Sequence, residues 1–228
     1  MAVRFSDEEF TRVKRLLPIF DWAKQTAMTK LTIMQQDLLL SEKRNPIEHL
    51  KARLKAPEAI AEKLQRLGLE ITADNVKSKL TDIAGIRMIC PFAKDIYRLV
   101  DILKLMTDWR IIEEEDYISN PKPSGYRSYH LLVMVSVSHS GITEEVPVEM
   151  QLRTAAMDFW ATMEHQVRYK YKEHIPNHLS DELVLCADKI SELDERMLLI
   201  QEIVSLINED SAGRSGLESI LPGKDGLC

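Results

Sequence analysis

Residues 124–154 read SGYRSYHLLVMVSVSHSGITEEVPVEMQLRT, and this stretch decides the fold. Residues 130–137 and 145–152 are rich in Val, Leu and Met, which predicts two β-strands. Between them, Ser140-Gly141 is typical of a tight turn. The stretch therefore predicts a β-hairpin.

The second of these strands carries polar residues at alternate positions. Glu149, Gln151 and Arg153 alternate with apolar residues, so all three lie on one face of the strand. Just before the first strand, a glycine, two tyrosines, an arginine, a serine and a histidine follow one another over residues 125–130. An acid, an amide and a cation on one sheet face indicate a site that holds a metal ion and a polyanion.

Outside this stretch, helical and extended patterns alternate along the chain. Periodicity and capping signals predict helices at about 6–40, 57–67, 72–80, 95–106, 155–172 and 180–208. Further strands are predicted at 50–55, 86–90 and 109–117, and a loop at 120–125. This order predicts an α+β protein with a mixed sheet of about five strands flanked by helices, including long helices at both ends.

Both terminal helices carry one apolar stripe. In the first, apolar residues recur at three- and four-residue steps from Phe20 to Leu38, and Pro18 marks either a kink or the true start of the helix. In the last, a heptad seam runs through Leu183, Cys186, Ile190, Leu193, Met197, Ile200, Val204 and Ile207. Two interpretations stay open: the helices pack on the core or on each other, or they also build a subunit interface.

The composition is that of an ordinary globular protein. The 228 residues are 45% hydrophobic and 29% charged, with a net charge of −6. This acidity argues against nucleic-acid binding driven by bulk electrostatics, and no apolar run is long enough to span a membrane. The N-terminus lacks the apolar core of a signal peptide and the three cysteines lie far apart, which together predict a cytoplasmic protein without disulfides.

Two carboxylates are candidate metal ligands. Asp82 precedes a predicted buried strand, Glu149 lies within another, and Mg²⁺ takes one or two carboxylates together with water and substrate phosphate. Taken alone, Asp82 fits a turn-capping residue and Glu149 fits a solvated strand face. Their weight comes from Arg87 and Arg153 nearby, because charges in apolar strands are costly unless they are paired or bind a ligand.

Basic residues cluster upstream of Asp82. Lys51, Arg53 and Lys55 share a strand face, and Lys63 and Arg66 are neighbours on the helix that follows. They form either a solvated basic surface, which periodicity alone favours, or a clamp for phosphates.

Tyr126 lies in a proline-bordered loop, where it either stacks on a purine or packs against the protein. The chain has no glycine-rich phosphate loop ending in Gly-Lys-Ser/Thr, no Gly-x-Gly-x-x-Gly and no Gly-x-Ser-x-Gly. Nucleophilic catalysis therefore lacks a candidate, whereas metal-assisted transfer to an oxygen has one.

Four runs together resemble a known family. They are residues 82–87 (DIAGIR), 124–130 (SGYRSYH), 149–154 (EMQLRT) and 159–165 (FWATMEH). In this order they resemble the RelA/SpoT synthetase domain over about residues 45–172, and the whole length is similar to its stand-alone form, the small alarmone synthetases. Residues 45–49 and 121–123 resemble the RelP-like branch more than the RelQ-like one.

The resemblance implies a nucleotidyltransferase-like core and a defined activity. The family transfers the β,γ-pyrophosphate of ATP to the 3′-hydroxyl of GDP or GTP, releasing AMP and making (p)ppGpp, the alarmone of the stringent response. The implied division is an N-terminal helical extension at 1–44, a synthetase core at 45–174, a C-terminal helix at 175–210 and a mobile tail at 211–228. A homotetramer is also implied, because the small members assemble through terminal helices.

The resemblance also implies roles residue by residue. Asp82 and Glu149 would hold Mg²⁺, and Glu149 would help to deprotonate the 3′-hydroxyl. ATP would be bound by Arg53 and Arg87 around its adenine and by Lys55, Lys63 and Arg66 at its phosphates. The guanine nucleotide would be bound by Tyr126 stacking on the base, by Lys122 and His130 at the phosphates, and by Gln151, Asp158 and Ala161 lining its pocket.

Departures from the family pattern bear on specificity. Glu115 stands where some relatives have a basic residue near the acceptor's phosphates, which leaves the choice between GDP and GTP open, and Asp158 stands where some carry asparagine. No adjacent His-Asp pair occurs, so the family's hydrolase domain is expected to be absent. Two other interpretations stay open: a pyrophosphokinase toxin acting on adenine nucleotides or tRNA, and a nucleotide-binding regulator without catalysis.

Overall fold

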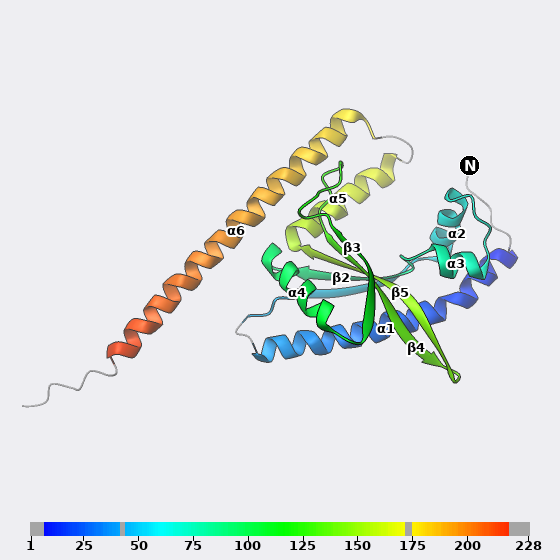
Figure 1. Cartoon of the computed structure of the whole chain (residues 1–228). Helices are drawn as coiled ribbons and strands as arrows, with labels where there is room; N and C mark the ends of the chain where they lie inside the picture. Colours follow the sequence, from blue (N-terminus) through cyan, green and yellow to red (C-terminus); the bar gives the residue numbers. More distant parts are fainter. Residues whose placement is uncertain (1–6, 42–43, 172–174, 219–228) are drawn as a thin grey trace, which may run out of the picture.

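The computed structural model describes residues 7–41, 44–171 and 175–218 (Figure 1). In chain order these contain α1 (Asp7–Ser41), β1 (His49–Leu54), α2 (Pro57–Arg66), α3 (Ala73–Lys79), β2 (Ala84–Cys90), α4 (Ala93–Leu105), β3 (Trp109–Asp116), β4 (Tyr129–His139), β5 (Ile142–Thr154), α5 (Ala155–Tyr171) and α6 (Asn177–Glu218). Every predicted helix and strand is confirmed, and only α6 differs from its predicted bounds by more than a few residues.

The strands form one mixed sheet in the order β1-β2-β5-β4-β3. β2 runs parallel to β5, and the other neighbouring pairs are antiparallel. β4 and β5 are the predicted hairpin, and its turn has Ser140 at φ 49° and Gly141 at φ 77°. Paired positive φ values are those of a tight two-residue hairpin turn. The predicted α+β class is confirmed.

The sheet has one apolar face and one polar face. α1 lies across the apolar face and contacts β1, β2, β4 and β5 (Figure 1). Phe20, Ala27 and Leu31 on its stripe are at most 1% exposed and belong to the same core as Ile86 of β2. Pro18 lies inside this helix, so the interpretation that it starts the helix is wrong. The opposite face carries polar side chains of β1, β2 and β5, and Asp158 of α5 pairs with two of them, Arg87 and Arg153.

Local signals mark the ends of α2 and α3. Pro57 is the first residue of α2, and Gly68 follows its end with φ 68°, the left-handed conformation that glycine tolerates best. Thr72 caps α3 by accepting the backbone N–H of Asn75 at 3.2 Å. These signals set α2 directly after β1, at the edge of the sheet where the site begins.

α6 differs most from its prediction. It ends at Glu218 rather than at 208, so part of the predicted tail is helical, and the rest of that tail, residues 219–228, lies outside the described residues. Its first half packs against α5, and Ala187 there is buried. Farther along, the seam residues Leu193, Met197, Ile200, Val204 and Ile207 are 49–58% exposed. Packing on the core therefore accounts only for the start of the seam. No helix in the described part of the chain is long and apolar enough to cross a membrane.

Candidate active site

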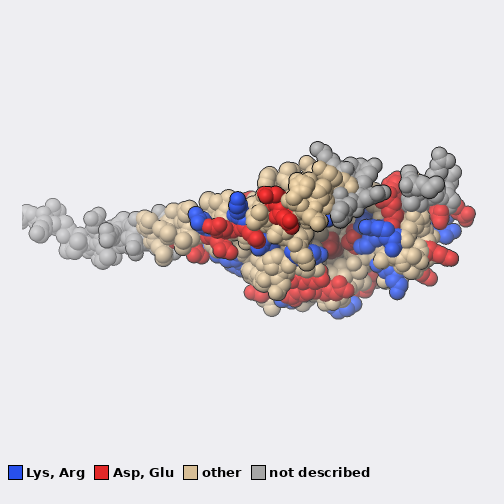
Figure 2. Space-filling model, turned by 90° about the horizontal axis from the view of Figure 1, so that it is seen from above, with Lys and Arg blue, Asp and Glu red and all other residues tan. Residues whose placement is uncertain are grey.

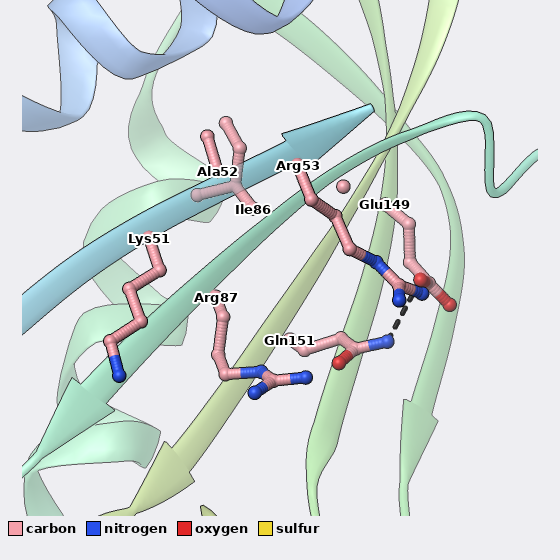
Figure 3. Close-up of a pocket in the computed structure, with 8 residues that line it drawn as sticks. Lys51, Ala52, Arg53, Ile86, Arg87, Glu149 and Gln151 are labelled. Carbon is pink, nitrogen blue, oxygen red and sulfur yellow. Dashed lines mark hydrogen bonds between the residues drawn. The ribbon is translucent and has the colours of Figure 1, made fainter. Parts of the chain in front are cut away.

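A cavity of about 210 Å³ opens on the polar face, over β1, β2 and β5. In the sheet register Arg53 lies beside Gly85 and Gly85 beside Glu149, whereas Arg87 lies beside Gln151. Figure 3 shows the side chains of Arg53 and Arg87 extending toward Glu149 and Gln151, while Ala52 and Ile86 point away from them. Alternation along three strands thus collects the polar groups on one face.

A second cavity, of about 410 Å³, adjoins the first. The two share Arg53, Arg87 and Gln151 as lining residues. The second adds Tyr126, Arg153, Ala161, Thr162, Glu164, His165 and Gln166. The structure therefore places residues predicted to bind ATP beside residues predicted to bind a guanine nucleotide, with three side chains common to both cavities.

Arg153 connects the groups of the second cavity. Its side chain is 5% exposed, and its Nη2 donates to Tyr126 Oη at 2.6 Å and to Gln151 Oε1 at 2.9 Å. Its Nη1 donates to Asp158 Oδ1 at 3.1 Å, and the same oxygen accepts Arg87 Nη1 at 2.8 Å. Paired in this way, the guanidinium can be buried without a large penalty. The predicted site set lacked Arg153, although alternation had placed it on this face.

The hydrogen bonds of Arg153 orient the next groups. Because Gln151 Oε1 accepts from Arg153, its Nε2 is free to donate to Glu149 Oε2, at 2.8 Å (Figure 3). Tyr126 Oη, which accepts from Arg153, also lies 2.8 Å from His130 Nε2, in hydrogen-bond range. His130 Nδ1 faces Glu149 Oε1 at 3.6 Å, which is too long for a hydrogen bond. One route from Arg153, through Gln151, therefore ends on the Glu149 carboxylate.

His130 is held in the neutral form. Burial lowers its pKa from 6.5 to about 4, and the positive charges of Arg153 and Lys122 act in the same direction. A neutral ring has one nitrogen that can accept a hydrogen bond and one that donates.

Asp82 lies between α3 and β2 and receives two lysines on one oxygen. Lys55 Nζ is 2.6 Å and Lys63 Nζ 2.9 Å from its Oδ2. Burial raises the pKa of Asp82, but the hydrogen bonds from both lysines outweigh burial and hold that pKa below its usual value. Its other oxygen, Oδ1, is buried without a hydrogen-bond partner. An ionised carboxylate with one unsatisfied oxygen fits a metal ligand.

Among the residues that the structure describes, no cluster of three or more His, Cys, Asp or Glu side chains could hold a metal ion. Mg²⁺ sites in proteins usually have only one or two carboxylate ligands, and water and substrate phosphates complete the coordination.

A third cavity, of about 120 Å³, has both Thr81, the residue before Asp82, and Glu149 in its lining. It is lined by Thr81, Glu113, Glu115, His130, Leu131, Leu132 and Glu149. Burial raises the pKa of Tyr117 to about 12, and its hydrogen bond to Glu115 adds to the shift. Lys122 Nζ lies 4.1 Å from the centre of the Tyr117 ring and 5.5 Å from that of Tyr126. The sequence analysis did not predict Tyr117 as a site residue, because no sequence signal distinguishes it from an ordinary aromatic residue at the end of a strand.

The remaining predicted residues lie at the margins of these cavities. Arg66 is exposed near the end of α2, one turn after Lys63, and lines none of the three cavities. Ala161 is 8% exposed and lines the second. Figure 2 shows one patch of Lys and Arg side chains toward the end of the molecule where α2 lies, with Asp and Glu side chains around it.

Known families and proteins match this chain over most of its length. The family described as "Region found in RelA / SpoT proteins" matches residues 52–174, more than half of the chain. A curated relative, GTP pyrophosphokinase YwaC of Bacillus subtilis (strain 168), is 44% identical over 191 residues, which cover 84% of this chain and 91% of that protein.

Two solved structures from Bacillus subtilis have the same fold. Small alarmone synthetase 1, bound to its product pppGpp, gives a TM-score of 0.79 at 34% identity and covers 84% of this chain and 97% of that one. Small alarmone synthetase 2 gives a TM-score of 0.76 at 42% identity and covers 83% of this chain and 97% of that one.

Proposed function

This chain belongs to the RelA/SpoT family and makes (p)ppGpp, and we propose that it does so by transferring the β,γ-pyrophosphate of ATP to the 3′-hydroxyl of GDP or GTP, releasing AMP. The observation that carries this proposal is the pair of adjoining cavities with Arg53, Arg87 and Gln151 in common. Such an arrangement suits a reaction in which two nucleotides must meet, and Glu149 lines the first cavity beside the shared wall.

The donor nucleotide is assigned to the end near α2. Arg53 and Arg87 hold the adenine between them, and Lys55, Lys63 and Arg66 bind the phosphates. Support comes from the position of Lys55 and Lys63, whose ammonium groups meet on Asp82 Oδ2. The two ammonium groups on this carboxylate can exchange that contact for phosphate oxygens when ATP is bound.

The acceptor nucleotide is assigned to the second cavity. Tyr126 stacks on the guanine, Lys122 and His130 reach the phosphates, and Gln151, Asp158 and Ala161 line the base pocket. Support comes from Arg153, which ties Tyr126, Gln151 and Asp158 into one network. A network in which each group is oriented by the next is pre-organised for binding.

Catalysis is assigned to the two carboxylates. Asp82 and Glu149 hold Mg²⁺, which when bound offsets the negative charge on the transferred group and on the leaving oxygen of AMP. Glu149 takes the proton of the 3′-hydroxyl as the bond from that oxygen to the β-phosphorus forms and the bond from the β-phosphorus to the AMP oxygen breaks. The hydrogen bond from Gln151 Nε2 keeps the Glu149 carboxylate in place while the proton moves.

An acceptor panel tests this function. Purified protein is incubated with Mg²⁺ and ATP labelled at its β-phosphate, in parallel with GDP, GTP, AMP and tRNA. We expect label in pppGpp or ppGpp only. Label in AMP or tRNA without label in a guanine nucleotide would favour a toxin, and no label in any acceptor would favour a regulator without catalysis.

The oligomeric state and the cellular location of the chain are part of the same proposal. The exposed apolar face of α6, with Met197, Ile200 and Val204, is assigned to a homotetramer interface, because such a face is seldom left open to water. Light scattering is expected to give four times the mass of 26.2 kDa; a monomer at micromolar concentration would contradict it. A cytoplasmic location, the RelP-like branch and the division of the chain at 44 and 174 are proposed with it.

A further inference from the structure

The loop that carries Tyr126 rests directly on α6. Gly125 has φ 86°, and a Cβ built on it would lie 2.7 Å from Ala187 Cβ and 3.4 Å from Val184 Cα. A separation of 2.7 Å is shorter than any real Cβ contact, so the loop backbone touches the helix where a side chain would not fit. Only glycine meets both demands at this position, the positive φ and the close approach.

Tyr126 itself belongs to a small hydrophobic cluster, separate from the main core. Trp160, Ala161 and Ala187 are buried in it, and Tyr126, Leu183 and Ile190 pack against them. Half of these residues come from α6. The cluster against which Tyr126 packs is therefore built from α5 and α6 and not from the sheet.

Polar contacts fasten the same loop to the same helix. Arg127 Nη2 donates to Asp188 Oδ1 at 3.1 Å, and Arg127 Nη1 donates to the Gly125 carbonyl at 3.4 Å. Trp160 Nε1 donates to the Leu183 carbonyl at 2.9 Å, which joins α5 to α6 beside the loop. The Arg127 side chain is only 17% exposed, so its direction is set by these partners.

We infer that the first half of α6 positions the guanine platform: Ala187 and Asp188 hold the backbone and Arg127 of the loop, and through them the ring of Tyr126. They are positioning residues, because they contact the loop and not the nucleotide. This inference rests on the proposed acceptor site. It assigns to the C-terminal helix a part in choosing and binding the acceptor, in addition to any part in assembly.

The inference predicts a selective change in kinetics. The residues assigned to ATP lie on β1, β2 and α2 and, for Lys55, directly after β1, whereas α6 holds the loop of the acceptor site. Loosening the loop should therefore raise KM for GDP and GTP and leave KM for ATP nearly unchanged. A helix that served only stability would instead lower the melting temperature and affect both substrates alike.

Asp188→Ala removes the contact to Arg127 from an exposed helix position, where ion pairs add little to stability. We expect KM for GDP and GTP to rise about three- to tenfold. KM for ATP and kcat should stay within about twofold of wild type, and the melting temperature within about 2 °C, because exposed ion pairs contribute little to stability. Glu192→Ala is the matched control, because it breaks an exposed pair with Arg196 on the same helix and should change nothing.

A charge swap between Arg127 and Asp188 tests the same contact a second way. Arg127→Asp should raise the guanine KM more than Asp188→Ala, since it places two carboxylates together, and Arg127→Asp with Asp188→Arg should restore most of the loss. If wild type labels GDP or GTP but all these variants match it, the inference is overturned and the proposed function stands. Equal rises in both KM values, or no rescue by the swap, would also overturn it. No guanine labelling by wild type would refute the function and the inference together.

Discussion

The two ends of the polar face hold their charges in different ways. Near α2, Lys55 and Lys63 converge on one oxygen of Asp82, and all three side chains are 17–28% exposed. Around Arg153, a guanidinium that is 5% exposed fixes an amide, a phenol and a carboxylate at once. Separate, partly solvated ion pairs can be exchanged for ligand oxygens, whereas a buried network keeps its shape. Under the proposed assignment, we expect the donor end near α2 to rearrange on binding and the acceptor end around Arg153 to be already formed.

Glu149 lies where the two ends meet, and its loss should have the largest effect. Glu149→Gln keeps the shape but removes the charge and the base, so we expect kcat to fall about 10²- to 10⁴-fold. The melting temperature and circular dichroism should match wild type. Glu145→Gln, four residues earlier on the same strand, is the control and should keep full turnover. Turnover above a tenth of wild type in Glu149→Gln would exclude its role as the base.

Arg153→Met should break the acceptor end alone. It leaves Tyr126, Gln151 and Asp158 without their shared donor, and removing one partner of a buried pair costs about 3–5 kcal/mol. Arg87 still pairs with Asp158, so we expect the lower part of that range in urea unfolding. KM for GDP and GTP should rise at least tenfold and more than KM for ATP. Equal rises would show that the two ends are one network.

Acid should loosen the acceptor end through His130. Its pKa is about 4 in the folded protein and 6.5 when unfolded, so between these values the unfolded chain binds more protons. Stability is therefore complete above pH 6.5 and falls as the pH drops toward 4, by up to about 3 kcal/mol. Urea unfolding at pH 7, 5.5 and 4 measures it. His130→Asn should flatten this dependence, whereas His178→Gln, at an exposed position on α6, should not.

Lys63→Met should change the stability only slightly, because Asp82 keeps Lys55 and partly exposed pairs are worth about 1 kcal/mol or less. KM for ATP should nevertheless rise about tenfold, since a phosphate ligand is lost, while KM for GDP and GTP stays within twofold. Lys79→Met, on exposed α3, is the control. A guanine KM that rises with that of ATP would remove the distinction between the ends.

Much of this site followed from alternation in single strands. Arg53, Arg87, Glu149 and Gln151 share one face because side chains on a strand point to opposite faces at every step. The order of strands in the sheet then brought three such strands together. The contact of Asp82 with two lysines could not be predicted from alternation in a strand, because Lys63 reaches Asp82 from a helix.

Arg153 shows why the rest needed the structure. Its partners lie 2, 5 and 27 residues away along the chain, at Gln151, Asp158 and Tyr126. Periodicity describes one element at a time and cannot tell which side chains from other elements will meet a buried cation. The burial of Arg153, and not its position in the strand, makes it the organiser of the acceptor end.

The two long helices also differ in what the sequence and the tertiary structure each determine. Apolar residues at three- and four-residue steps determined, from sequence alone, that both α1 and α6 are helices with one apolar stripe. Only the tertiary structure decided what each stripe meets: α1 lies across four strands, whereas much of α6 extends beyond the elements that could cover it. The reason is physical, because local hydrogen bonds and steric preferences form a helix, but its burial depends on surfaces distant in the chain. The same holds for Tyr126, which the sequence places in a loop and which α6 holds in place.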